Sequence, residues 1–261
     1  MDYTIKTLKI NNGTMDYSFF GTGDKNLIII SGMSTFGVPE MAEAVSLRYA
    51  SYIDEYTVYL FDRLHPLPDN CSIREMAGDL ASAMKKLGIS NADIMGNSQG
   101  GMMALSLAIN HPDLVHSMIL CSTYCRPTPT GNVTFPIWKK LSLEQNGVEL
   151  YRDFFTRAYS NPNLELLKQI ENTATDDQCR KFAIMLQANL DFDCFNDLNK
   201  IKCPVFVIGV ENDKVLGVEG SNEIAEILGC DKHIYKEYGH SVCDEAPDFI
   251  DRMHDFYASI W

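Results

Sequence analysis

The chain has 261 residues, 46% of them hydrophobic and 22% charged, which is enough apolar material for one substantial core and excludes a disordered or fibrous protein. Its formal net charge of −13 disfavours nucleic acid and anionic membranes as partners, because both bind clustered lysine and arginine. Residues 1–12 alternate apolar and charged side chains and do not form the apolar segment of a signal peptide. We therefore expect a cytoplasmic protein without a membrane span.

The predicted elements begin with a β-hairpin. Tyr3–Ile10 and Thr14–Phe20 have the apolar pattern of strands, and the turn residues Asn11, Asn12 and Gly13 lie between them. From residue 26 onward the pattern changes, because strand and helix periods begin to alternate.

This alternation predicts an α/β fold in which helices flank an eight-stranded, mostly parallel sheet. After the hairpin, the expected strands are Asn26–Ile30, Thr57–Phe61, Ala92–Met95, His116–Cys121, Val205–Gly209 and His233–Lys236. The expected helices are Pro39–Ile53, Ser72–Leu87, Gln99–Asn110, Ser221–Leu228 and Pro247–Ile260. The second of these helices begins with a capping-box pattern, Ser72 followed by Glu75.

A helical insertion is expected between the two halves of the sheet. Residues 128–200 form the expected cap, and residues 1–127 and 201–261 form the expected core. The helical patterns of the cap are Val148–Tyr159, Leu164–Asn172 and Asp176–Asn189. Its large side chains exceed what one thin layer has to bury, so some are expected to line a substrate pocket: Trp138, Phe154, Phe155, Tyr159 and Met185. Ordinary packing within the cap is the alternative for each of them.

Ser98 lies in the sequence Gly96-Asn97-Ser98-Gln99-Gly100, between a predicted strand and a predicted helix. A serine on such a turn has a strained backbone and a projecting hydroxyl, and the turn closes only if the residues two before and two after it lack side chains. Glycine occupies both positions. The helix that follows directs N–H groups and its positive dipole end toward the serine. This pattern predicts a serine nucleophile.

A serine hydroxyl needs a neighbouring base and a carboxylate that orients this base. His240 follows the predicted strand His233–Lys236 at the edge where the active sites of parallel sheets gather, and it is the expected base. The other histidines lie at ordinary surface or capping positions: His65, His111, His116, His233 and His254. Asp213 follows the strand Val205–Gly209 at the same edge and is the expected acid, with Glu211 in reserve. A solvated acidic turn is the alternative explanation for this loop.

Two backbone N–H groups are expected to bind the negative oxygen that forms on the substrate. One belongs to Gln99, directly after the nucleophile, and the other to Met33, in the loop after the strand Asn26–Ile30. Gly32 allows the backbone of this loop to come close, although a structural glycine turn also explains this residue.

The eight cysteines are scattered without the spacing of a disulfide framework, which favours a reducing compartment. Cys121 and Cys125 are the nearest pair, but no further ligands follow at a spacing typical of zinc. We interpret them as buried thiols and expect no metal. The expected chemistry requires no cofactor.

Together these features make the chain resemble the α/β-hydrolase fold superfamily, in its capped branch of esterases, lactonases, carbon–carbon hydrolases and cofactor-free haloperoxidases. The resemblance extends over nearly the whole chain. It is carried by Gly32, Met33, Asp62, Arg63, Ser98, Asp213 and His240. It implies a Ser-His-Asp triad that cleaves a carboxylic ester of a small, largely apolar substrate through an acyl-enzyme. One triad serves many acyl chemistries, so the resemblance does not define the substrate.

Two departures from the family pattern lie outside the triad. Ser31-Gly32 stands where most relatives have His-Gly, and Leu64 follows Asp62-Arg63 where relatives continue toward glycine. Two alternative functions stay open. The same triad also suits a carbon–carbon bond hydrolase or a lactonase, and a non-catalytic small-molecule receptor would retain it as a ligand trap.

Overall fold

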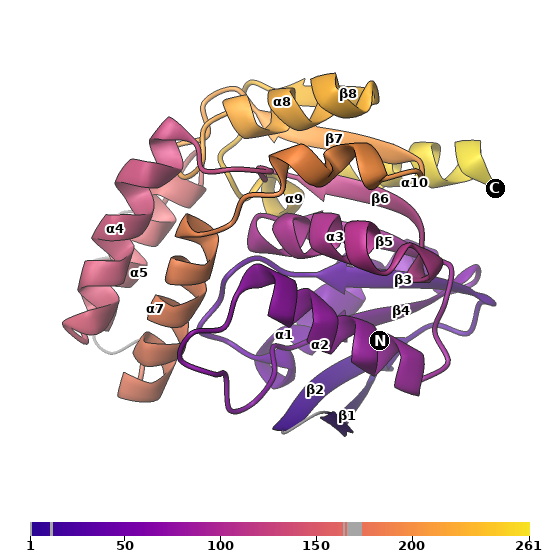
Figure 1. The fold of residues 1–261 in the computed structure, drawn as a ribbon, viewed down its shortest axis with the longest axis horizontal. Coiled ribbons are helices and arrows are strands. Elements are labelled where there is room, and N and C mark those ends of the chain that lie inside the picture. The colour runs from indigo at the N-terminus through magenta and orange to yellow at the C-terminus, as the bar shows by residue number, and fades with distance from the viewer. Residues whose placement is uncertain (1, 11–12, 164, 166–173) are drawn as a thin grey trace.

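The computed structural model describes residues 2–10, 13–163, 165 and 174–261. Within them lies one eight-stranded sheet, in the order β1-β2-β4-β3-β5-β6-β7-β8 (Figure 1). The strands are β1 (Thr4–Ile10), β2 (Gly13–Phe20), β3 (Lys25–Ile30), β4 (Tyr56–Phe61), β5 (Ala92–Asn97), β6 (Val115–Cys121), β7 (Val205–Val210) and β8 (Asp231–Tyr235).

Parallel pairing dominates the sheet. β1 and β2 form an antiparallel hairpin, β2 is also antiparallel to β4, and the other neighbouring strands are parallel. The central strands carry continuous apolar runs, such as residues 27–30 in β3, because both of their faces are buried. The carboxyl ends of the parallel strands meet at one edge, and Ser98 directly follows one of them.

Helices cover both faces of the sheet (Figure 1). One face packs against α1 (Val38–Arg48), α9 (Val242–Glu245) and α10 (Phe249–Ile260). The other packs against α2 (Ile73–Lys86), α3 (Gln99–Asn110) and α8 (Glu219–Leu228). Short 3-10 helices occur at Ala50–Tyr52, Pro112–Leu114 and Phe195–Lys200. The sheet therefore separates two apolar cores.

The helical insertion leaves the core after β6 and returns at β7. It contributes α4 (Pro129–Leu143), α5 (Gly147–Ala158) and α7 (Asp176–Leu190), which stand at the left of Figure 1. Of the helix expected at 164–172, only Glu165 belongs to the described residues. The insertion and the mostly parallel sheet confirm the predicted fold class.

Helix α4 was not predicted, because prolines and a glycine interrupt its sequence. Pro129 occupies the first turn, where a missing N–H removes no helical hydrogen bond. Thr128 caps the helix, since its hydroxyl accepts a hydrogen bond from the Gly131 N–H at 3.1 Å. Pro136 lies in the helix interior. Because proline usually breaks or kinks a helix there, the sequence pattern predicts no helix across this residue.

Smaller differences concern the ends of elements. The helix expected over 39–53 ends at Arg48 and continues only as a 3-10 turn, and α9 was not expected at all. The capping box of α2 forms as predicted: the Glu75 N–H donates to Ser72 Oγ at 3.2 Å, and the Ser72 N–H donates to Glu75 Oε2 at 2.8 Å.

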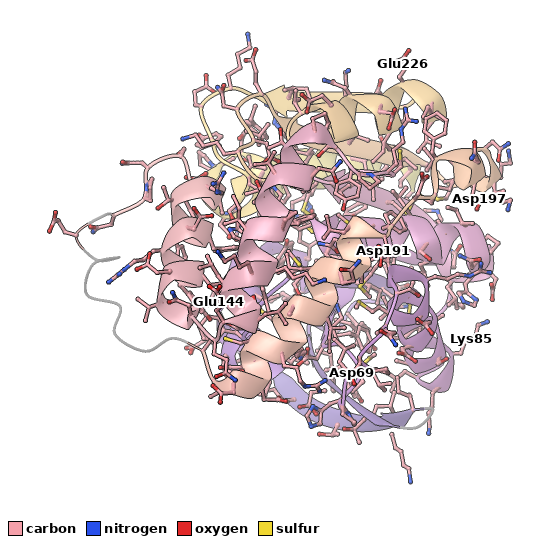
Figure 2. All side chains as sticks on the ribbon, turned by 60° about the vertical axis from the view of Figure 1, so that its left-hand side comes forward. Asp69, Lys85, Glu144, Asp191, Asp197 and Glu226 are labelled. Carbon is pink, nitrogen blue, oxygen red and sulfur yellow. The ribbon has the colours of Figure 1, made fainter. Side chains whose placement is uncertain are left out.

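Acidic side chains project from both the core and the insertion. Figure 2 shows Asp69 and Glu226 on the core and Glu144 and Asp191 on the insertion, and all four are exposed.

Among the described residues, no helix combines the length and the apolar character needed to cross a bilayer.

Candidate active site

Ser98 lies between β5 and α3 with φ of 54° and ψ of −120°. A positive φ strains a residue that carries a side chain, and strain at a strand-to-helix turn is typical of a serine nucleophile. Neighbouring groups hold this conformation. The Ser98 N–H donates to the Cys121 carbonyl at 2.9 Å, and Thr123 Oγ1 donates to the Ser98 carbonyl at 2.7 Å. The serine is 5% exposed.

The turn around Ser98 has no space for side chains on its flanking glycines. A Cβ on Gly96 would lie 2.6 Å from the Gly100 carbonyl oxygen. A Cβ on Gly100 would lie 1.9 Å from the carbonyl oxygen of Ile30 in β3. Both contacts involve backbone atoms, so the strained conformation of Ser98 depends on glycine at each position.

His240 and Asp213 lie together at the carboxyl edge of the sheet. His240 Nδ1 is 2.8 Å from Asp213 Oδ2, and both side chains are buried. The other carboxylate oxygen, Oδ1, accepts hydrogen bonds from the N–H groups of Val215 at 2.8 Å and Leu216 at 2.9 Å. Two backbone donors thus fix the carboxylate, and its second oxygen orients the imidazole. An imidazole held in this way can take a proton from a serine hydroxyl.

The loop that carries His240 is anchored on the insertion. The Ser241 N–H donates to the carbonyl oxygen of Ala158, the last residue of α5, at 2.8 Å. The Gly239 N–H donates to Glu245 Oε2 at 2.7 Å, and a Cβ on Gly239 would lie 2.6 Å from the same Ala158 oxygen. The position of His240 therefore depends on α5 as well as on the core.

The other candidates for acid and base lie elsewhere. Glu211 is exposed, and its N–H pairs with the Tyr235 carbonyl at 2.8 Å. His116, at the start of β6, is bonded to Asp93 at 2.8 Å and belongs to the opposite edge of the sheet.

The two residues predicted to supply oxyanion donors lie beside the nucleophile. A Cβ on Gly32 would lie 3.2 Å from Ser98 Cβ, so the loop that contains Met33 passes next to the serine. Gln99 is the first residue of α3, where a backbone N–H has no acceptor within the helix. Both N–H groups belong to backbone that approaches the serine closely.

Side chains connect these two residues to helix α7 of the insertion. Gln99 Nε2 donates to the Met185 carbonyl at 3.1 Å and to Asn189 Oδ1 at 2.7 Å. Asn189 Nδ2 in turn donates to Met33 Sδ at 3.2 Å. Gln99 and Asn189 are completely buried. A single residue of α7 thus bridges the side chains of both predicted oxyanion residues.

Arg63, on the core side, binds the side chain of Gln99 as well. Its Nη2 donates to Gln99 Oε1 at 3.1 Å and to the Ser31 carbonyl at 2.9 Å. Burial lowers the pKa of Arg63 to about 10, although the nearby Asp62 acts in the opposite direction, and the guanidinium stays charged at neutral pH. The sequence did not reveal these roles. Their only signal was that Ser31 and the residues after Arg63 depart from the family pattern.

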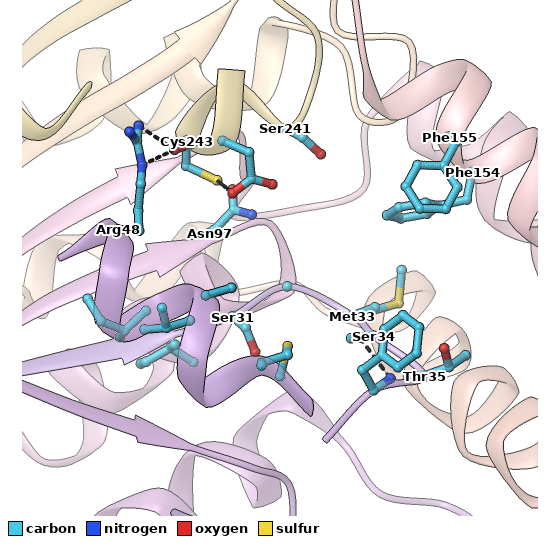
Figure 3. A pocket seen from close by; sticks show the side chains of 18 of the residues that line it. Ser31, Met33, Ser34, Thr35, Arg48, Asn97, Phe154, Phe155, Ser241 and Cys243 are labelled. Carbon is cyan, nitrogen blue, oxygen red and sulfur yellow. Dashed lines mark hydrogen bonds between the residues drawn. The ribbon is translucent and has the colours of Figure 1, made fainter. Parts of the chain in front are cut away.

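A cavity of about 490 Å³ lies between the loop after β3, α1 and the insertion (Figure 3). Gly32, Asn97 and Ser241 line it, and the last two are the chain neighbours of Ser98 and His240. Neither Ser98 nor His240 is itself a lining residue. The cavity therefore reaches the residues beside the predicted triad.

Three of the five predicted pocket residues line this cavity: Phe154, Phe155 and Tyr159. Trp138 does not, because it is completely buried, packs on Phe154 and donates through Nε1 to Asp153 at 2.6 Å. Met185 does not line it either, and it contributes its carbonyl oxygen to Gln99 instead.

The side of the cavity formed by α1 was not predicted. Met41, Ala44, Val45 and Arg48 line it, and their spacing of three and four places them on one helix face. The signal was present in the sequence, but core packing explains the same spacing.

Comparison with known proteins identifies the family. Residues 25–166 match the family model described as the alpha/beta hydrolase fold. The chain belongs to the α/β-hydrolase fold family. It is similar to the protein named "Putative carbamate hydrolase RutD" from Caulobacter sp. (strain K31), with 27% identity over 225 residues, which are 78% of this chain and 80% of that protein.

Solved structures share the fold at lower identity. An α/β hydrolase, MGS-M2, from a Medee basin deep-sea metagenome library superimposes with a TM-score of 0.85 at 19% identity and covers 97% of both chains. The enol-lactonase from Burkholderia xenovorans LB400 gives a TM-score of 0.82 at 20% identity, over 97% of this chain and 100% of the other.

Proposed function

We propose that this chain is a serine hydrolase that cleaves a carboxylic ester or related acyl bond of a small, largely apolar substrate. Ser98 attacks the carbonyl carbon while His240 takes the hydroxyl proton, and His240 then gives this proton to the leaving group. Asp213 orients His240 and stabilises its cation. Water then hydrolyses the acyl-enzyme, with His240 as its base.

The N–H groups of Gln99 and Met33 are the proposed oxyanion donors. Fixed backbone donors stabilise the tetrahedral intermediate more than the planar substrate, since the negative charge develops only during the attack. The network of Arg63, Gln99 and Asn189 supports this assignment, because it leaves the backbone around the serine little freedom to move.

The observation that carries the proposal is the hydrogen bond of 2.8 Å between His240 and Asp213, at the edge where a strained serine follows β5. Each feature alone occurs in proteins without catalysis. Together they supply a nucleophile, a base and the group that orients the base, from three separate strand ends.

The proposed organisation follows from the same site. Residues 128–200 act as a cap that shapes the substrate pocket, over a core of residues 1–127 and 201–261. The substrate is a small molecule, as the cavity volume indicates. A cytoplasmic location is supported by the cysteines, since all eight are free thiols.

Hydrolysis of p-nitrophenyl esters of short fatty acids tests the proposal. We expect turnover by the native protein and loss of nearly all of it in Ser98→Ala, with an unchanged circular dichroism spectrum. Ser90→Ala, which changes an exposed serine, is the matched control and retains full activity. Equal turnover by Ser98→Ala and the native protein would contradict the assignment.

A carbamate is the second candidate substrate, because the relative from Caulobacter sp. (strain K31) has the name "Putative carbamate hydrolase RutD". The same attack at a carbonyl carbon cleaves either bond. Matched p-nitrophenyl esters and N-alkylcarbamates distinguish them by kcat/KM. The panel also includes a lactone and a carbon–carbon hydrolase substrate, the alternatives that the triad allows. If the folded protein binds these compounds and cleaves none of them, the result would favour its function as a receptor.

A further inference from the structure

The two ends of the cavity differ in chemistry. One wall is aromatic and includes Phe154 and Phe155 from the insertion. The other end is polar and includes Arg48, Asn97 and Asp244. Figure 3 places Arg48 and Asn97 away from the two phenylalanines. A ligand that fills the cavity therefore has an apolar part and a polar part.

Asp244 presents a carboxylate to this polar end. The residue is exposed, yet burial raises the pKa of its carboxyl group. The exposure of Asp244 and the effect of burial on its pKa are consistent if much of its accessible surface faces the cavity that it lines. Its hydrogen-bond donors among the described residues are uncharged: Tyr159 Oη at 3.2 Å and Cys243 Sγ at 3.8 Å. An ionised carboxylate offers about four acceptor positions, so some are left for a ligand.

Arg48 does not occupy these positions. Its Nε and Nη2 donate to the Cys243 carbonyl at 3.1 and 2.8 Å, and Nη2 also donates to the Ala246 carbonyl at 3.0 Å. Its charge acts on Asp244 through space and opposes the effect of burial. The Arg48 guanidinium thus donates to the backbone that follows His240. The Asp244 carboxylate keeps free lone pairs.

Asn97 also lines the polar end of the cavity. Its Oδ1 atom is buried and has no hydrogen-bond partner in the described part of the chain, but it has almost no accessible surface at which a ligand could bind. The carboxylate of Asp244 is therefore the acceptor that this end offers. Because Asn97 directly precedes Ser98, the polar end lies close to the proposed reaction centre.

We propose that the polar end of the cavity binds an ammonium group of the substrate through Asp244, while the aromatic wall binds its apolar chain. This inference rests on the proposed function and specifies its substrate as a small acyl compound with an amino group. An anionic acceptor favours a charged donor over a hydroxyl and repels a carboxylate, while Arg48 at the same end directs its hydrogen bonds to backbone carbonyls. The net charge of −13 also attracts cations to the molecule.

The first experiment measures binding without chemistry. Hexylammonium, hexanol and hexanoate are titrated into the native protein, Asp244→Asn and Asp251→Asn, and dissociation constants are determined by NMR. Asp251 is an exposed residue of α10 and serves as the matched control. We expect hexylammonium to bind roughly tenfold more tightly than hexanol, as for a charge-assisted hydrogen bond, and hexanoate to bind most weakly.

Asp244→Asn should remove this preference, and Asp251→Asn should retain it. Equal affinities of the native protein for hexylammonium and hexanol would overturn the inference. A preference that survives in Asp244→Asn would also overturn it, because the charge would then be recognised elsewhere.

The second experiment compares two esters of equal size, p-nitrophenyl ε-aminocaproate and p-nitrophenyl enanthate, which has a methyl group in place of the ammonium. The expected ratio of their kcat/KM values is about tenfold in favour of the ammonium ester, and it falls toward unity in Asp244→Asn. A ratio of one in the native protein contradicts the inference. If neither ester is hydrolysed, the proposed function fails, and the binding experiment still decides the inference.

Discussion

One carboxylate oxygen of Asp213 accepts hydrogen bonds from the backbone, and the other faces His240. We therefore expect activity to be sensitive to replacement of Asp213 by its amide. In Asp213→Asn the group that faces His240 Nδ1 can no longer be an anion, so the preferred tautomer and the cation of the imidazole both lose support. We expect kcat for a p-nitrophenyl ester to fall by about 10³- to 10⁴-fold, which is less than the loss in Ser98→Ala.

Glu211→Gln is the control for this prediction, because Glu211 lies in the same loop and is exposed. Its activity should stay within about twofold of the native value, as for other surface substitutions. The assignment of the acid is wrong if Glu211→Gln inactivates the enzyme and Asp213→Asn leaves it active.

Gly100 is the residue where the turn around Ser98 tolerates a side chain least. A methyl group there would lie 1.9 Å from the Ile30 carbonyl oxygen, so β3 and α3 would have to separate. We expect Gly100→Ala to lower the free energy of unfolding by several kcal/mol, roughly 3 or more. Urea denaturation measures this change.

Gly78→Ala is the matched control within α2, since no atom lies within 4 Å of its added Cβ. Alanine is the better helix former, and this variant should gain about 0.5–1 kcal/mol. Equal stability of the two variants would show that the turn is not as closely packed as described.

At the scale of elements, helix α7 connects the insertion to the proposed oxyanion hole. Asn189 bonds the side chains of Gln99 and Met33 from one side, and Lys181 pairs with Asp62 at 3.2 Å further along the helix. The insertion therefore contributes to the shape of the proposed catalytic centre as well as to the pocket. A shift of α7 would displace groups beside the nucleophile.

Asn189→Ala tests this coupling. The variant removes one of the two acceptors of Gln99 Nε2, and the backbone beside Ser98 gains freedom. We expect kcat to fall by about tenfold, since loss of a complete oxyanion donor costs about 10²- to 10³-fold. KM should change less than kcat if Asn189 positions the donors and does not contact the substrate.

Arg180→Ala is the control on the same helix. Arg180 pairs with Asp69 of the core in an exposed ion pair away from Gln99. Such pairs contribute about 0–1 kcal/mol, so activity should be nearly unchanged. If both variants lose kcat equally, the effect comes from loosening of the insertion and not from the bond to Gln99.

At the scale of the whole molecule, stability should decrease as the pH falls from about 7.5 to about 5.5. Burial lowers the pKa of His111 and His233 below the ordinary value of 6.5. In the unfolded chain both imidazoles protonate near 6.5, whereas the folded protein resists protonation until the pH is lower. The unfolded state thus binds more protons in this range, and acidification favours it.

Urea denaturation across this pH range provides the measurement. The double variant His111→Gln, His233→Gln should show a flatter dependence of the unfolding free energy on pH. An unchanged slope in the double variant would mean that other groups are responsible.

The sequence was sufficient to predict the sheet and the edge of it at which the candidate active-site residues lie. Apolar strand runs and helix periods gave the alternation correctly, because both faces of the central strands are buried and the pattern is strong. The same reasoning brought Asp213 and His240 to neighbouring loops, where the structure joins them in a hydrogen bond. The roles proposed for Ser98, Gln99 and Met33 stay predictions.

The parts that could not be predicted depend on tertiary packing. Helix α4 contains Pro129 in its first turn, where proline is tolerated, and Pro136 in its interior, where a sequence pattern does not predict a helix. The polar links of Arg63 and Asn189 join residues far apart in the chain, and no local pattern indicates them. The α1 side of the cavity was missed because a helix face that lines a cavity has the same spacing as one that packs on a core.

The central claim is that Ser98 is an activated nucleophile, and covalent labelling with a fluorophosphonate tests it most directly, because the probe requires no knowledge of the acyl group. Intact-mass spectrometry is applied to the native protein, Ser98→Ala and His240→Ala. We predict one adduct on the native protein, none on Ser98→Ala and almost none on His240→Ala. An absent adduct on the folded native protein, or an adduct that persists in Ser98→Ala, would contradict the proposed mechanism.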